Sequence, residues 1–522
     1  MNWKRPLALS TAALTLGTAL AACGNPTAAA PDPTPTPAAE VQSLSTTGST
    51  VKAPKYVFLF IGDGMSYPQI QSTSDFLGAL NDADYRQAQP SLDDNGGAIL
   101  DGPEYLNFMN FEAAGSAVTY DSNSFAPDSA STATSISTGY KTYSGSINVD
   151  ETGTISYETI AEQLHAQKGY SVGVITSVNL NHATPAAFYA HQASRNDYYD
   201  IGLELIDSGF EYFAGGGLLK PTGAEGDQAD LYALAEKAGY HVVKTQAEAE
   251  QVTGGPVVII DEHLADSDAM AYEIDRTDDM WALADYVEKG IEVLSQDKDG
   301  FFMMCEGGKI DWACHANDAA SSIHDTKALS DAVQVAIDFA AEHPDETLIL
   351  VTGDHETGGL TIGFAGTDYD TYLDLLENQK ISYAKFDSDY VASYKENKTS
   401  FEDVLSDIEE LFGLKAQGAA DDKLVLTEYE MEQLRAAYEK SVNGTAASQY
   451  EQEEYVLYGT YEPLSVTITH IINNKSGISF TSYSHTGLPV AVLAHGVNAG
   501  QFNGYYDNTQ IYHKLAGMLG IA

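Results

Sequence analysis

Basic residues are few in this chain of 522 residues, where 26 lysines and arginines stand against 75 aspartates and glutamates and the formal net charge is −49 at pH 7. Binding to nucleic acids or anionic membranes through a general electrostatic field needs a basic surface, so the composition argues against both. Cysteine is also scarce, with three residues in all. Hydrophobic residues make up 43% and charged residues 19%, which indicates a folded chain.

The N-terminus has the pattern of an export signal. Lys4 and Arg5 precede an apolar run at 7–22 that contains no charge. The run has no charged flank on its far side, which favours a signal over a membrane-spanning helix. Residues 20–23 read Leu-Ala-Ala-Cys and resemble the lipobox of bacterial lipoproteins, which predicts removal of residues 1–22 and a lipid on Cys23. An ordinary signal cleaved nearby is the alternative.

Residues 23–50 are rich in proline, threonine and alanine, which predicts an extended tether between the lipid and a folded domain at 51–522. We therefore expect a periplasmic or cell-surface protein whose contact with a membrane is through its N-terminal lipid. The two remaining cysteines, Cys305 and Cys314, form a disulfide or stay as buried free thiols; an exported location permits the first without requiring it.

Strand-length apolar runs alternate with helical patterns from residue 56 onward. The strands are expected at 56–61, 170–175, 257–260, 301–305, 347–351 and 488–494, and the helices at 158–168, 281–294 and 324–341, with another helical stretch ending at 191–195. This alternation predicts an α/β fold, a three-layer sandwich around a largely parallel sheet. Residues 366–462 break it with polar, acidic, helical sequence. We interpret them as an insert that shapes access or a subunit contact, or as an inert surface elaboration.

A run of small residues at 127–139 contains a candidate nucleophile. Asp128 or Ser129 would cap a helix that ends at Gly139. Ser129 would then lie at the positive end of the helix dipole, which favours an anion. Capping alone also explains a serine in this place. Candidate metal ligands elsewhere in the chain favour a nucleophile.

The candidate ligands are acids and histidines that mostly follow predicted strands. They are Asp63 after 56–61, Asp311 and His315 four residues apart, Asp354 with His355 after 347–351, and His485 before 488–494. Carboxylate oxygens and imidazole nitrogens are ligands that zinc accepts, and the carboxyl edge of an α/β sheet is where ligands bind. We expect these side chains to converge there.

Seven dispersed motifs together resemble those of alkaline phosphatases and occur in that family's order. They are the residues 62–65, 127–142, 182–187, 306–307, Asp311 with His315, 354–355 and 485–487. The resemblance covers the chain from about residue 55 to its end, apart from the acidic insert. It implies the fold of that family, hydrolysis of small phosphate monoesters through a phosphoserine, and the possibility of a homodimer.

The resemblance also implies a site with two zinc ions and one magnesium ion. The first zinc would be held by Asp311, His315 and His485, the second by Asp63, Asp354 and His355 beside Ser129, and the magnesium by Asp63, Thr184 and Glu306. Arg195 would hold the phosphate by two hydrogen bonds.

Two positions depart from the best-known bacterial members, which have aspartate in place of His182 and lysine in place of Trp312. Histidine is a poor direct ligand for magnesium, so we expect His182 to act through bound waters and the third site to be weaker. Trp312 removes a cation near the phosphate, which should loosen product binding.

Two other classes compete with this interpretation. The first is a phosphodiesterase or sulfatase of the same superfamily, although Ser129 with Thr132 and Ala133 does not match a sulfatase motif and diesterases often lack the arginine. The second is a surface lipoprotein that binds metals without catalysis, which would need neither Ser129 nor Arg195.

Overall fold

The computed structural model describes residues 52–82, 100–444 and 451–521. The predicted signal and tether at 1–22 and 23–50 lie outside the described residues. Within these ranges a ten-stranded sheet has the order β14-β2-β13-β8-β1-β7-β3-β4-β6-β5. Its strands are β1 (Tyr56–Gly62), β2 (Ala113–Val118), β3 (Ser171–Thr176), β4 (Tyr212–Gly215), β5 (His241–Val243), β6 (Val257–Ile260), β7 (Phe301–Gly307), β8 (Thr347–Gly353), β13 (Val490–Gly496) and β14 (Gly504–Asp507). All neighbours pair in parallel except β13, which is antiparallel to both β2 and β8.

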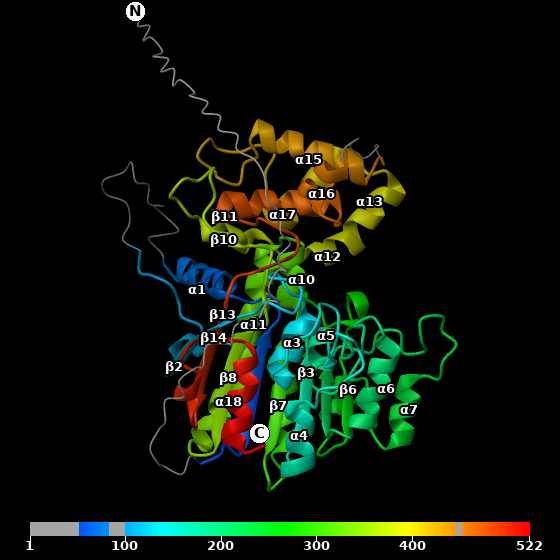
Figure 1. The fold of residues 1–522 in the computed structure, drawn as a ribbon. Helices are drawn as coiled ribbons and strands as arrows, with labels where there is room; N and C mark the ends of the chain where they lie inside the picture. The colour runs from blue at the N-terminus through cyan, green and yellow to red at the C-terminus, as the bar shows by residue number, and fades with distance from the viewer. Residues whose placement is uncertain (1–51, 83–99, 445–450, 522) are drawn as a thin grey trace, which may run out of the picture. The chain divides into compact units, whose positions relative to one another are not determined.

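Helices cover both faces of the sheet and make the sandwich that the alternation predicts (Figure 1). Alternate side chains of β1 point to opposite faces, so Val57 and Leu59 join one apolar core while Phe58 and Phe60 join another. The first core is closed by α3 (Ser129–Thr138), α4 (Ile160–Lys168), α6 (Tyr198–Ser208), α7 (Leu231–Ala238) and α18 (Thr509–Leu519), the second by α1 (Tyr67–Asn81), α9 (Leu283–Leu294) and α11 (Ala319–Glu342). The predicted α/β fold is confirmed.

The acidic insert forms helices whose apolar core also includes residues of α1 and α11. These elements are η4 (Leu373–Asn378), α12 (Tyr383–Phe386), η5 (Asp387–Val391), α13 (Ala392–Asn397), α14 (Phe401–Phe412), α15 (Glu428–Ser441) and α16 (Glu451–Tyr458), followed by α17 (Pro463–Ser476). Helix α17 packs against α15 and α16 (Figure 1). Thr427 and Glu430 form a capping box at the start of α15.

Short elements complete the chain. They are α5 (Ala183–Ala186), α8 (Gln246–Ala249), α10 (Lys309–His315), β9 (Glu356–Thr357), β10 (Thr361–Ile362), β11 (Ile478–Ser479), β12 (His485–Thr486), η1 (Asn107–Asn110), η2 (Asp266–Asp268), η3 (Glu273–Asp275) and η6 (Ala499–Phe502). Strands β12 and β9 pair with each other, which brings His485 opposite Thr357. No helix among the described residues has the length and hydropathy needed to cross a membrane.

One predicted helix is wrong. The stretch expected to end at 191–195 is helical only over α5, because the chain beyond Ala186 turns and Gln192 pairs with Ile147 in an antiparallel bridge. The backbone N–H of Arg195 then donates to the carbonyl of Gly145 at 2.8 Å, a hydrogen bond that a continuing helix would forbid. Helix α11 begins earlier than expected, since Asp318 caps it. Cys305 and Cys314 are buried free thiols, so the disulfide is not formed.

Candidate active site

Three neighbouring strands end level with one another, and acidic residues lie at these ends. Gly62 of β1 is in register with Gly307 of β7 and with Gly353 of β8. Asp63 and Asp354 come directly after β1 and β8, while Glu306 is the penultimate residue of β7. The backbone pairing of the sheet therefore sets the spacing of these carboxylates, as expected for the carboxyl edge of an α/β sheet.

Ser129 begins α3, and the helix has the ends that the sequence predicts. The Asp128 carboxylate accepts a hydrogen bond from the backbone N–H of Ser131, and Gly139 ends the helix with φ of 78°. Ser129 is buried, with its Oγ 3.2 Å from Nε2 of His355 and 3.4 Å from Oδ1 of Asp63. The hydroxyl thus meets the strand-end ligands at the positive end of a helix.

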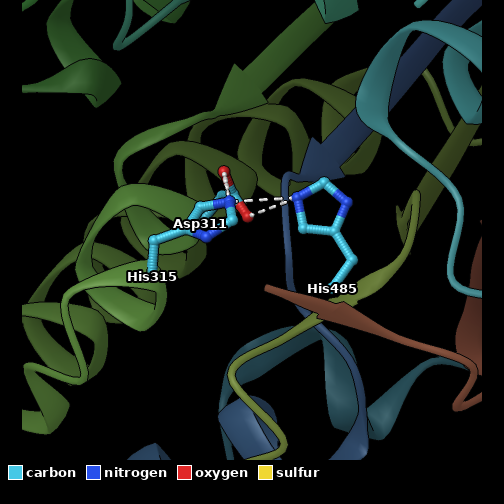
Figure 2. Close-up of side chains that lie close together, drawn as sticks. All are labelled: Asp311, His315 and His485. Carbon is cyan, nitrogen blue, oxygen red and sulfur yellow. Dashed lines mark hydrogen bonds and ion pairs between the residues drawn. The ribbon is translucent and has the colours of Figure 1, made fainter. Parts of the chain in front are cut away.

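Asp311, His315 and His485 form the first ligand group, and Figure 2 shows their side chains pointing toward one another. The backbone carbonyl of Tyr483 lies 2.6 Å from Nδ1 of His315, and that of Pro127 lies 2.5 Å from Nδ1 of His485. A carbonyl only accepts hydrogen bonds, so both Nδ1 atoms carry a proton, and in the neutral rings both Nε2 atoms present lone pairs. These Nε2 atoms are 3.0 Å apart. Burial opposes a charge on His315, but the nearby Asp311 carboxylate raises its pKa, so a cation, either a proton or a metal ion, fits between the two nitrogens.

Asp63, Asp354 and His355 form the second group. Nε2 of His355 lies 3.2 Å from Oδ1 of Asp63 and 3.4 Å from Oδ2 of Asp354, and all three side chains are buried. Asp354 is oriented by the hydroxyl of Thr132 at 3.1 Å and the backbone N–H of Gly64 at 3.2 Å. Such hydrogen bonds fix the direction of the carboxylate toward the group.

Asp63 is shared with a third group that contains Glu306 and His182. The hydroxyl of Thr184 donates to Oδ2 of Asp63 at 3.1 Å, so the structure brings Thr184 to the same place. Nδ1 of His182 lies 4.0 Å from Oε1 of Glu306, and both atoms are buried without a hydrogen-bond partner among the described residues. Buried polar atoms are normally paired, so an ion or its waters would account for these two.

The pKa shifts also fit bound cations. Burial and the nearby Asp63 charge raise the pKa of Glu306 well above its usual range and that of Asp354 to about 8. Burial alone would lower the pKa of His355, but the charges of Asp354 and Asp63 raise it to about 10. Burial lowers the pKa of His485 to about 4. The site therefore favours positive charge among its carboxylates and keeps His485 neutral, the form that binds metal.

Arg195 lies beside Ser129 in a pocket of about 330 Å³. Its NH1 donates to Oδ2 of Asp128 at 2.8 Å and its NH2 lies 3.0 Å from Nε2 of His182. Burial opposes the charges of this pair, but their mutual attraction raises the pKa of Arg195 and lowers that of Asp128. The arginine is thus held charged and oriented at the wall of the pocket.

Every side chain predicted from the sequence reaches this region, and three unpredicted ones accompany them. Trp312 lines the pocket together with Tyr383 and Tyr461 from the acidic insert, and Lys309 is buried behind Trp312. The spacing of the insert tyrosines carries no periodic signal that separates them from ordinary core residues. Lys309 follows two glycines and lies two residues before Asp311, and this nearness to a predicted ligand is the signal for it in the sequence.

An α/β sandwich whose strand ends gather three carboxylate and imidazole groups around a buried serine defines a metal-dependent hydrolase. The chain belongs to the alkaline phosphatase family, whose model matches residues 54–521. It is therefore a phosphatase that hydrolyses phosphate monoesters.

Known relatives agree with this membership. Alkaline phosphatase 3 of Bacillus subtilis (strain 168) is 30% identical over 465 residues, covering 88% of this chain and 87% of that protein. The crystal structure of a cold-active alkaline phosphatase from a psychrophilic Shewanella species has a TM-score of 0.70 at 27% identity and covers 89% of this chain and 99% of that chain. The alkaline phosphatase of Thermus thermophilus shares the fold, with a TM-score of 0.71 at 22% identity and coverage of 91% and 93%.

Proposed function

We propose that Ser129 is the nucleophile and that the reaction passes through a phosphoserine. The observation that carries this proposal is the position of the Ser129 Oγ, which is buried at the start of α3 and within 3.4 Å of both Asp63 and His355. Oγ attacks the phosphorus and loses its proton to solvent, while the ester P–O bond breaks and the alcohol leaves with a proton from water. Water then attacks the phosphoserine, the Oγ–P bond breaks, and Ser129 regains its proton.

Arg195 orients the phosphoryl group in this proposal. Its planar guanidinium can donate two parallel hydrogen bonds to phosphoryl oxygens, which fixes the phosphorus opposite the attacking oxygen. Asp128 keeps the guanidinium in place through the 2.8 Å ion pair, and at the same time caps the helix that begins with Ser129. Asp128 therefore positions both the proposed nucleophile, Ser129, and the proposed phosphate-binding residue, Arg195.

We assign the metals to the three groups described above. Asp311, His315 and His485 would hold one zinc, Asp63, Asp354 and His355 a second, and Asp63, Glu306 and Thr184 a magnesium. Bound zinc ions supply charge stabilisation for the attacking and leaving oxygens of an in-line displacement. The oxygen atoms of Asp63, Glu306 and Thr184 suit a hard cation.

His182 would contact the third cation through water. Arg195 has no acceptor, so the 3.0 Å contact makes Nε2 of His182 the acceptor and leaves its proton on Nδ1. Burial and the charge of Arg195 lower the pKa of His182 to about 4, so the ring stays neutral. A protonated Nδ1 can donate to a water or to Glu306 but cannot bind a metal.

Turnover of p-nitrophenyl phosphate by wild type, Ser129→Ala and Ser135→Ala tests the nucleophile. Ser135 is a buried serine of the same helix and serves as the matched control. We expect loss of activity only in Ser129→Ala, and about two zinc ions and one magnesium ion per chain by metal analysis. Activity retained by Ser129→Ala would overturn the proposal. Preference for bis(p-nitrophenyl) phosphate would favour a diesterase, and no turnover by wild type with both metals supplied would favour a metal-binding lipoprotein.

We also propose that the protein is exported and anchored through a lipid on Cys23. The signal pattern at 1–22 and the tether composition at 23–50 support this proposal. Wild type should fractionate with membranes and release from them on cleavage in the tether, whereas Cys23→Ser should not be retained. Retention of the variant would contradict the anchor. A homodimer stays a prediction that sedimentation analysis tests.

A further inference from the structure

We propose that Trp312, Tyr383 and Tyr461 form a binding subsite for the alcohol part of the substrate, and that this subsite favours alcohols carrying a planar ring, such as nucleosides. We call these three side chains the aromatic wall. The inference rests on the proposed function, because that mechanism decides where the leaving alcohol lies.

The aromatic wall lines the same pocket as the proposed nucleophile and the first ligand group. Ser129, Arg195, Asp311 and all three wall residues line the same pocket. Trp312 directly follows Asp311, and its ring is 6.0 Å from that of His182. Ser129 Oγ lies beside Asp63 and His355 of the second ligand group. In an in-line displacement a cation held by Asp311, His315 and His485 would therefore stabilise the leaving oxygen, and the alcohol attached to that oxygen would lie toward the wall.

Trp312 is supported by a buried cation. Nζ of Lys309 is 4.6 Å from the ring of Trp312 and 2.9 Å from Oδ1 of Asp266, which holds the lysine in place. This lysine is fully buried. A cation against one face of an indole restrains the ring, and leaves the tryptophan a fixed surface toward the pocket.

The two tyrosines are held by a chain of aromatic contacts. The ring of Tyr383 lies 5.8 Å from that of Tyr272, and the two hydroxyls are 3.2 Å apart. Tyr461 contacts Tyr383 edge to face at 5.7 Å and stacks with Tyr483 at 6.3 Å and 29°. The Tyr483 carbonyl in turn orients His315. The wall is therefore rigid and continuous with the first ligand group, as a preformed subsite requires.

The space and chemistry of the pocket suit a ring with polar edges. Its volume of about 330 Å³ is roughly ten times the share of one liquid water, about 30 Å³, and exceeds what a phosphoryl group alone needs. Aromatic faces stack on planar rings, and nucleobases all present such a face. Tyr272 donates to the Tyr383 oxygen, so the Tyr383 proton remains available to an acceptor on the ligand. The Tyr461 hydroxyl has no hydrogen bond to any described residue and can also reach a ligand.

The sharpest comparison uses AMP and ribose 5-phosphate, whose reacting ester bonds are the same and which differ by the base. We expect wild type to favour AMP by about 10-fold in kcat/KM, mainly through KM. Tyr461→Leu and Tyr383→Leu should bring that ratio close to one, mainly by raising KM for AMP. Tyr461→Phe keeps the ring and should retain most of the preference. Tyr369→Leu is the control, since Tyr369 belongs to the insert but is 78% exposed and away from the pocket.

A binding measurement separates recognition from chemistry. Adenosine should inhibit wild type competitively, ribose should inhibit it at least about 10-fold more weakly, and Tyr461→Leu should lose the difference. Equal kcat/KM for the two esters in wild type, or an AMP preference unchanged in both leucine variants, would overturn the subsite and leave the proposed function intact. Failure of wild type to hydrolyse either ester would overturn both.

Discussion

Arg195 and Asp128 form an ion pair in which NH1 lies 2.8 Å from Oδ2, while Oδ1 of the same aspartate accepts a hydrogen bond from the backbone N–H of Ser131 at 3.1 Å. One carboxylate therefore orients the proposed phosphate clamp and caps the helix that carries Ser129. These two duties can be separated by mutation, because asparagine caps a helix as well as aspartate but carries no charge.

Asp128→Asn should free Arg195 without unfolding α3. We expect the inhibition constant for inorganic phosphate to rise about 5-fold, since the guanidinium loses its orienting charge, with little change in thermal stability. Asp128→Ala should show the same loss of inhibition and in addition lose about 1 kcal/mol of stability with the helix cap. Inhibition measurements and thermal unfolding of both variants test this. Unchanged phosphate inhibition in both would show that Arg195 needs no support from Asp128.

His191 should make stability depend on pH. Its two ring nitrogens each lie 3.3 Å from a carboxylate, one from Glu162 and one from Glu204. Burial opposes the imidazolium, but the hydrogen bonds to these acids raise its pKa from 6.5 to about 10. Because the folded pKa is the higher one, this stabilisation is complete below about pH 6.5 and is lost as the pH rises through about 10.

His191→Gln should therefore unfold more easily than wild type at pH 6, by roughly 2 kcal/mol, the scale of hydrogen bonds to charged groups. The difference should shrink above about pH 10, as wild type also loses the charge. Thermal unfolding at pH 6, 8 and 10.5 measures it, with His495→Gln as a control at an exposed ion pair to Glu112. A gap between His191→Gln and wild type that stays constant from pH 6 to 10.5 would contradict the assignment.

His182→Asp should change the magnesium dependence of activity. The imidazole can offer the third group at most a hydrogen bond from Nδ1, 4.0 Å from Glu306 Oε1, whereas a carboxylate offers oxygen that magnesium prefers. We expect half-maximal activation at a magnesium concentration about 10-fold lower than in wild type. Magnesium titration of the metal-depleted enzyme, refilled with zinc, measures this. His182→Asn adds oxygen without charge and should lie between the two; identical titrations for all three proteins would refute the prediction.

Trp312→Lys should tighten product binding. Trp312 lines the pocket with Ser129 and Arg195, so a lysine in its place would bring a cation toward the phosphate. We expect inorganic phosphate to inhibit the variant about 10-fold more strongly at low ionic strength, with the effect weakening as salt rises. Trp312→Leu removes the ring without adding charge. If both variants change phosphate inhibition equally, charge is not the cause.

The sequence predicted structure best where a local pattern of residues is enough to define a strand or the end of a helix. The apolar run at 56–61 predicted β1, and Asp128 with Gly139 predicted both ends of α3. The four-residue spacing of Asp311 and His315 suits one face of a helix, and both residues lie in α10. Each of these signals is local, so no tertiary contact was needed to interpret it.

Prediction failed where partners come from distant parts of the chain. The helical pattern around 191–195 gave way to the bridge between Gln192 and Ile147, which no local propensity reveals. Tyr383 and Tyr461 are distinguished from other insert tyrosines by the packing of the insert beside the pocket. That packing depends on the insert core as a whole, and it is invisible in the spacing of either residue.

Strands β1, β7 and β8 end in register at Gly62, Gly307 and Gly353, so the pairing of the central sheet sets the positions of the proposed metal ligands. Two members of the aromatic wall come from the acidic insert: Tyr383 lies in α12 and Tyr461 lies between α16 and α17. Both pack in a small cluster with Tyr272 and Ala313, apart from the two cores that cover the sheet. The proposed reaction centre thus lies at the central sheet, whereas two residues of the proposed alcohol subsite come from the acidic insert. Substitutions in the insert can therefore change which alcohols the enzyme favours, while the residues proposed to break the phosphorus–oxygen bond stay the same.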